Sequence, residues 1–91
     1  MHAVVVKVKI EDFESTRTHL AERVVPRASQ APGFVAGYWS RSADGNDGLS
    51  MVLFDSEAAA NTALEMVRAA AAENEGVSLE DVEVREVVAN A

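Results

Sequence analysis

Four segments of the chain alternate between apolar and other residues with the two-residue period of a β-strand. These segments are residues 2–10, 34–42, 49–55 and 82–89. One side of the first segment carries only aliphatic side chains, those of Val4, Val6, Val8 and Ile10. The other side starts apolar and ends with Lys7 and Lys9, so the aliphatic side is the one expected to face the core.

Two further segments have the wider apolar spacing of amphipathic helices. The first helix is predicted to have Asp12 as its N-cap, and Phe13, Leu20 and Val24 lie on its apolar stripe. Pro26 falls within this pattern and has no N–H to donate. It predicts a kink in the helix or an end to its regular hydrogen bonding near Arg23.

The second helix is predicted to have Ser56 as its N-cap, to run to about Asn74 and to stop at Gly76. Its apolar stripe consists of Ala59, Ala63, Met66, Val67 and Ala70. Residues 76–81 are then expected to form a loop that leads into the last strand.

The resulting order of elements is β-α-β-β-α-β, with the turn-forming residues 43–48 joining the two middle strands as a hairpin. Right-handed crossovers on either side of a hairpin predict an α+β protein with a ferredoxin-like fold. Its antiparallel four-stranded sheet would have the strand order 4-1-3-2 and both helices on one face. Residues 1–91 are expected to form a single domain.

The hairpin is apolar on both faces, which suggests that both faces are covered. Phe34 and Tyr38 point to one face of its first strand, and Val35 and Trp39 point to the other. In its second strand, Leu49, Met51 and Leu53 point to one face, and Val52 and Phe54 point to the other. Because two helices cover only one face, the pattern predicts a homodimer that closes sheet to sheet into an α/β barrel. The alternative is a monomer with an exposed apolar patch, which is uncommon.

The length of the hairpin loop decides which face carries Trp39. An even number of loop residues places Trp39 opposite Val52, on the same face as Phe54. An odd number places it on the face of Met51 and Leu53. We favour the even loop.

Composition and charge exclude several classes of function. The 91 residues include 8 Lys+Arg and 15 Asp+Glu, a net charge of −7 that argues against nucleic acid as a partner. The chain has no cysteine and no clustered metal ligands, so we expect neither a metal nor another cofactor. No apolar run exceeds four residues, which argues against a membrane span. In the absence of a targeting signal, we expect a cytoplasmic protein.

Two short motifs resemble a known family. Pro32-Gly33-Phe34 leads into the second strand, and Phe54-Asp55-Ser56-Glu57-Ala58 forms the step from the third strand to the second helix. Together with the order of elements, they resemble the antibiotic biosynthesis monooxygenase-like domain of the dimeric α/β-barrel superfamily. The resemblance implies a homodimer with a small-molecule pocket inside the barrel. Some members oxidise quinol-type aromatic compounds without metal or flavin, and others degrade haem.

The residues that haem-degrading relatives use are absent from this chain. Residues 2–10 contain no Asn, Phe54 stands where those relatives have a Trp, and residues 56–75 contain no His. Haem degradation is therefore not expected. The Asn/Trp pair usual in the cofactor-free oxidases is missing too, so we assign no catalytic residue.

The candidate ligand-binding residues are Trp39, Phe54, Val52, Lys7 and Arg85. Trp39 would stack on an aromatic ligand, although packing in the core or at a dimer interface is the commoner role of such a residue.

The cations on the outer strands have two interpretations. Lys7, Lys9 and Arg85 are expected to share one sheet face with Glu83. Inside a barrel, such cations would orient a carboxylate or a phenolate. The simpler interpretation, which we favour, is a cross-strand ion pair such as Lys9 with Glu83.

These observations leave two functions open. The first is a homodimeric α/β-barrel protein that binds a small apolar or aromatic molecule and acts as a cofactor-independent monooxygenase. The alternative is a non-catalytic dimerisation or ligand-binding module.

Overall fold

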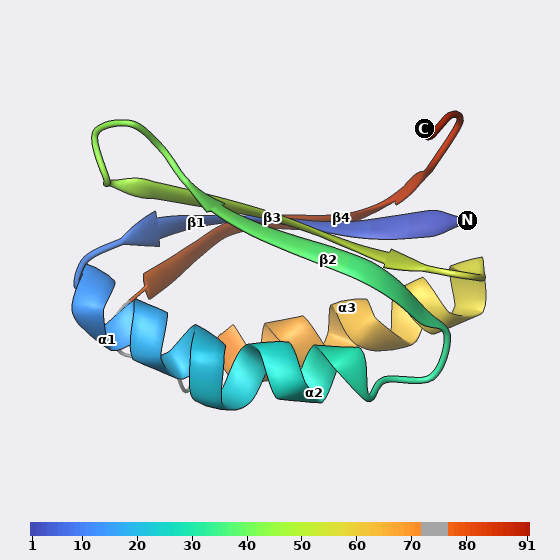
Figure 1. Cartoon of the computed structure of the whole chain (residues 1–91), viewed down its shortest axis with the longest axis horizontal. Coiled ribbons are helices and arrows are strands. Elements are labelled where there is room, and N and C mark those ends of the chain that lie inside the picture. Colours follow the sequence, from blue (N-terminus) through green and yellow to red (C-terminus); the bar gives the residue numbers. More distant parts are fainter. Residues whose placement is uncertain (72–76) are drawn as a thin grey trace.

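The computed structural model describes residues 1–71 and 77–91 of the chain. A four-stranded sheet forms one layer, and the helices form a second layer against one of its faces (Figure 1). The elements are β1 His2–Ile10, α1 Phe13–His19, the π-helix η1 Leu20–Val24, α2 Val25–Ser29, β2 Phe34–Arg41, β3 Asp47–Phe54, α3 Glu57–Ala71 and β4 Val77–Glu86. The antiparallel strand order β2-β3-β1-β4 confirms the predicted ferredoxin-like order 4-1-3-2. In the described part of the chain, no helix is both long enough and apolar enough to cross a membrane.

The core lies between the sheet and α3. Val4 and Phe54 are 1% and 2% exposed, and Ala60 on α3 is fully buried. Alternation places Val4 and Val6 on the same side of β1, and this is the aliphatic side that the sequence assigns to the core. A small residue such as Ala60 lets the helix approach the strands closely, so α3 is held tightly against the centre of the sheet.

The start of the first helix agrees with the prediction. The Asp12 carboxylate caps α1 by accepting a hydrogen bond from the backbone N–H of Ser15, at 3.2 Å. The carbonyl of Asp12 also accepts the hydroxyl of Thr16 at 2.8 Å. These two bonds fix the direction in which the helix leaves β1.

The interruption caused by Pro26 is confirmed, although it begins earlier than predicted and does not end the helix. The α-helical pattern gives way to a π-helical turn at Leu20 rather than near Arg23, and α2 continues the helix to Ser29. In a regular α-helix the Pro26 ring would clash with the carbonyl of Glu22. The wider π turn gives the ring room, so the chain stays helical past the proline.

The last strand begins five residues before its predicted start. The predicted strand covered residues 82–89, and residues 76–81 were assigned to a loop, but β4 runs from Val77 to Glu86. A bulge explains the error, because the register with β1 pairs Lys7 with Asp81 and Val8 with Leu79. The extra residue breaks the two-residue alternation. The predicted helix end at Asn74 and Gly76 lies outside the described residues.

The hairpin confirms the even loop and corrects one pairing. Arg41 pairs with Gly48, which leaves six residues (42–47) between them. Trp39 therefore lies on the face of Phe54 as expected, but its partner is Ser50, and Gly37 is the residue opposite Val52. β2 ends at Arg41, one residue before its predicted end. β3 spans Asp47–Phe54 rather than the predicted residues 49–55.

Candidate functional site

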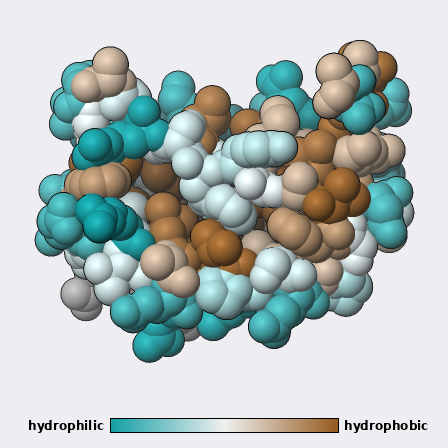
Figure 2. Space-filling view, viewed as in Figure 1, coloured by the Kyte–Doolittle hydropathy of each residue, from teal (hydrophilic) through white to brown (hydrophobic). Residues whose placement is uncertain are grey.

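A cavity of about 700 Å³ lies beside the core, between the sheet and the helical layer. We call it the interlayer cavity. The sheet contributes its floor, which includes Val4, Val6, Val8, Trp39, Val52 and Phe54. The helices contribute its roof, which includes Phe13, Leu20, Val24, Ala63, Met66 and Val67. In Figure 2, apolar side chains are open to view between the two layers.

The cavity exists because the first helical segment stands away from the sheet. Thr16 is the only buried residue in α1, η1 and α2 together. The apolar residues Leu20 and Val24 of this segment are only half-buried and face the cavity. Apolar side chains that line an open space rather than a packed core are typical of small-molecule sites.

Trp39 has a defined position on the floor. Its indole ring lies back along β2 over Gly37, where an added Cβ would come within 2.6 Å of the Trp39 Cη2 atom. Glycine at this position therefore makes room for the ring. The indole packs against the buried core cluster and remains half-buried beside the cavity.

Half of the eight described polar residues that line the interlayer cavity are arginines. Four arginines contribute to its lining: Arg17, Arg23, Arg27 and Arg41. Arg41 is exposed and lies over the Phe13 ring, with its guanidinium carbon 3.7 Å from the ring centroid. His19 is half-buried in the same lining.

The opposite face of the sheet, which no helix covers, is the open face (Figure 1). It contains a smaller concavity of about 330 Å³, lined by Val5, Lys7, Leu49, Met51, Asp81, Glu83 and Arg85. Lys7, Lys9, Glu83 and Arg85 share this face, as predicted.

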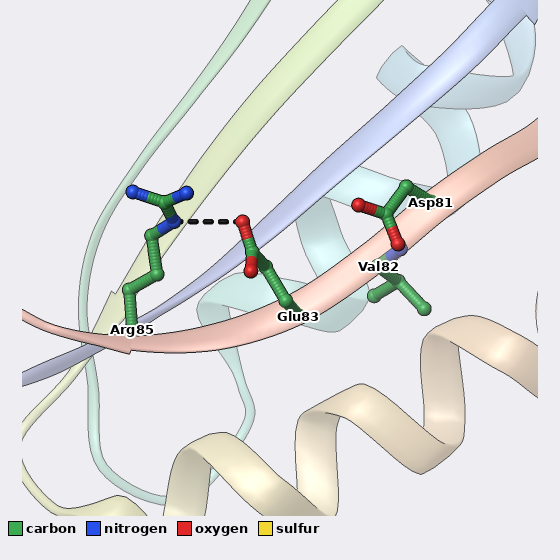
Figure 3. A network of polar contacts seen from close by, with 4 residues as sticks. All are labelled: Asp81, Val82, Glu83 and Arg85. Atoms are coloured by element: carbon green, nitrogen blue, oxygen red, sulfur yellow. Dashed lines mark hydrogen bonds and ion pairs between the residues drawn. The ribbon is translucent and has the colours of Figure 1, made fainter.

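The ion pair on the open face differs from the predicted one. Glu83 accepts a hydrogen bond from Arg85 Nε at 2.7 Å on the same strand (Figure 3), and Lys9 lies opposite Ser78. Glu83 lies opposite Val5, four residues before Lys9 along β1, so Lys9 and Glu83 are not neighbours. The Asp81 carboxylate accepts a hydrogen bond from the backbone N–H of Val82 at 2.9 Å.

The structure divides the candidate residues between the two faces. Trp39, Val52 and Phe54 line the interlayer cavity. Lys7 and Arg85 lie on the open face. The five therefore do not form one site, because the sheet separates the two groups.

Sequence reasoning missed the arginines of the first helical segment. Arg17, Arg23 and Arg27 lie within eleven residues of a chain that has 8 Lys+Arg in all. This concentration beside an apolar stripe was the available signal. Its meaning depends on the gap between that helix and the sheet, which the sequence pattern does not reveal.

Metal coordination has no support in the described residues. Within residues 1–71 and 77–91, no group of three or more His, Asp or Glu side chains is placed to hold a metal ion. His2 is the first residue of β1, and its Nε2 is 3.3 Å from the Glu57 carboxylate at the start of α3.

Solved structures with the same fold include two proteins that are named as monooxygenases. HapK from Hahella chejuensis has a TM-score of 0.74 and 12% identity, with 100% of this chain and 96% of HapK covered. A protein named as a candidate antibiotic biosynthesis monooxygenase from Deinococcus radiodurans has a TM-score of 0.62 and 16% identity, with coverage of 100% and 95%. The monooxygenase ActVA-Orf6 of Streptomyces coelicolor, solved with the ligand Nanaomycin D, has a TM-score of 0.61 and 16% identity, with coverage of 99% and 92%.

These comparisons define the class of fold to which the chain belongs. No family model and no curated protein matches the sequence. The likeness to monooxygenase structures expected from the two short motifs is confirmed for the fold, and it extends over the full length of the chain.

Proposed function

We propose that this protein binds a small apolar or aromatic molecule in the interlayer cavity and oxidises it without a cofactor. The observation that carries the proposal is the cavity itself, whose volume of about 700 Å³ and apolar lining suit a molecule of several fused or linked rings. Trp39 offers an aromatic surface on the floor for stacking.

The fold comparisons support the oxidative part of the proposal. Two of the structures that share the fold are named as monooxygenases, and one of them was solved with Nanaomycin D. In a cofactor-free reaction, the substrate supplies the electrons and molecular oxygen is the oxidant. A polycyclic hydroquinone would gain one oxygen atom on its ring and become a hydroxyquinone, and the other oxygen atom of O₂ would leave as water.

Oxygen consumption tests the reaction directly. An oxygen electrode should record uptake when the protein is mixed with one or more members of a panel of polycyclic hydroquinones. Trp39→Leu should reduce that uptake, because leucine removes the stacking surface from the cavity floor. Uptake no faster than in buffer for every member of the panel would contradict the oxidase proposal.

A non-catalytic ligand-binding module is the second candidate, and one observation favours it. Among the described residues that line the interlayer cavity, His19 is the only one of the types His, Asp, Glu, Lys, Tyr and Cys that commonly act as general acids or bases. Binding of a neutral dye without oxygen uptake would support this second function. The saturable signal to follow is quenching of Trp39 fluorescence by N-phenyl-1-naphthylamine.

We further propose that the open face pairs with the same face of a second copy. Tyr38, Leu49 and Met51 on this face are 66%, 52% and 41% exposed. An apolar sheet face of this kind is costly to leave in water. Native mass spectrometry should give twice the monomer mass of 9.7 kDa, and Met51→Glu should give the monomer. A monomeric wild-type protein would contradict the dimer.

A further inference from the structure

We propose that the ligand of the interlayer cavity is an organic anion, with an apolar ring-containing body and a carboxylate or equivalent acidic group. This inference rests on the proposed function, because it specifies the chemistry of the molecule that the cavity receives. It is carried by the charges around the cavity rather than by its volume.

The lining of the cavity departs from the charge balance of the chain. The protein has 15 Asp+Glu against 8 Lys+Arg, yet half of those cations line this one cavity: Arg17, Arg23, Arg27 and Arg41. Among the described lining residues there is no Asp or Glu at all. In an acidic protein, the Asp, Glu, Lys and Arg side chains among the described lining residues of this cavity are thus all arginines.

The cavity arginines also lack the partners that the other arginines have. Arg68 lies 3.3 Å from the Glu65 carboxylate, and Arg85 lies 2.7 Å from that of Glu83. No carboxylate of residues 1–71 or 77–91 lies within ion-pair distance of any of the four cavity arginines. Their guanidinium groups are therefore available to an acidic group that enters from outside.

Arg41 shows how one of these groups is held in place. Its guanidinium stacks on Phe13, which is itself a lining residue. Stacking uses the flat face of the group and leaves the N–H donors at its edge free to bind an oxygen acceptor. The same side chain can therefore contact the apolar body of a ligand and an acidic substituent.

The physical argument joins the two properties of the cavity. Apolar walls exclude water and strengthen the field of nearby charges. Four like-charged side chains around such a space repel one another, and an entering anion offsets that repulsion. A neutral ligand would fill the apolar volume but would leave this charge uncompensated.

A matched pair of dyes tests the inference. 1-Anilinonaphthalene-8-sulfonate and N-phenyl-1-naphthylamine share one ring skeleton, and only the first carries a negative charge. Trp39 is the only tryptophan, so energy transfer from its indole to the dye reports binding at the cavity. Each dye is titrated into the wild type, the triple variant Arg17→Gln/Arg23→Gln/Arg27→Gln and the control Arg68→Gln.

The triple variant should bind the sulfonate dye about fivefold more weakly and the neutral dye within about twofold of the wild type, since exposed ion pairs are individually weak. Added salt should weaken binding of the sulfonate dye alone. Arg68→Gln should change neither affinity. If the triple variant loses its circular dichroism signal, the single variants Arg23→Gln and Arg27→Gln make the same comparison in smaller steps.

The outcomes separate this inference from the function on which it rests. Binding of the neutral dye, with sulfonate binding that does not respond to the arginines or to salt, would overturn the inference alone. An equal loss of both dyes in a folded triple variant would also overturn it, because the arginines would then only shape the cavity. Failure of both dyes to bind the wild type would overturn both proposals.

Discussion

Replacing Gly37 with alanine should displace the Trp39 indole from its position on the cavity floor. The added Cβ would lie 2.6 Å from Cη2 and 2.8 Å from Cζ3 of that ring. Carbon atoms in favourable contact are about 3.5–4.0 Å apart, so the ring edge must move by about 1 Å. The displaced ring would enter the space that we assign to a ligand.

The expected change in stability is a balance of two effects. Overpacking of this kind costs about 1–3 kcal/mol. Replacing glycine by alanine within a strand returns about 0.5–1 kcal/mol, because alanine loses less backbone entropy on folding. The free energy of unfolding should therefore fall by about 1 kcal/mol, which lowers the Tm of a domain of this size by about 4–8 °C.

A double-mutant cycle isolates the contact with the indole. Trp39→Leu removes both ring atoms that the new Cβ would meet, so Gly37→Ala should stabilise that variant by about 0.5–1 kcal/mol. Urea unfolding followed by far-ultraviolet circular dichroism gives the free energy of unfolding of all four proteins. If Gly37→Ala lowered the free energy of unfolding equally in the wild type and in the Trp39→Leu variant, the assigned position of Trp39 would be refuted.

Three further predictions concern the core, the helix cap and the hairpin loop. Phe54→Ala should lower the free energy of unfolding by about 3–5 kcal/mol in urea titrations. Val88→Ala, at an 86% exposed position, should change it by less than about 0.5 kcal/mol. Equal effects of the two substitutions would contradict the placement of Phe54 in the core. Asp12→Ala should cost about 1 kcal/mol in the same assay, because the N–H of Ser15 loses its acceptor, and an unchanged midpoint would argue against the cap. The Ser42 hydroxyl, and after it the backbone N–H of Asn46, donate hydrogen bonds to the Asp44 carboxylate and lower the pKa of Asp44 below its ordinary value. Because the pKa of Asp44 is lower in the folded state, the stability that its ionised carboxylate contributes is complete above the ordinary pKa and is lost as the pH falls through the folded-state pKa. Ser42→Ala should raise the pKa of Asp44 in an NMR titration. An unchanged pKa would contradict the role of the Ser42 hydroxyl.

The strands that lie regularly in the sheet could be predicted because burial on one face imposes a period of two. β1 matches its predicted bounds, and the parity of the hairpin loop placed Trp39 on the correct face. The start of β4 could not be predicted from a period of two. Leu79 and Val82 both pack against the core, but the bulge places them three residues apart in the sequence. A period of two becomes misleading wherever one residue is inserted.

The candidate site was harder to predict than the fold because it depends on a gap between layers. Val52, Phe54 and Trp39 were selected as hairpin residues that needed cover, and they do line the cavity. Whether a helix packs tightly or stands away from the sheet is decided by tertiary placement, including the π turn before Pro26. The sequence therefore indicated apolar residues but not the space above them, and the arginines around that space appeared to be ordinary surface residues.

The most direct test of the central claim is to map ligand binding on the two faces of the sheet by NMR. N-Phenyl-1-naphthylamine is titrated into isotope-labelled protein while the Trp39 indole N–H and the valine, leucine and methionine methyl signals are followed. We expect large shifts for Trp39, Val4, Val6 and Val52 in the interlayer cavity and small ones for Val5 and Met51 on the open face. Shifts confined to Val5 and Met51 would place the ligand on the other side of the sheet and contradict the account.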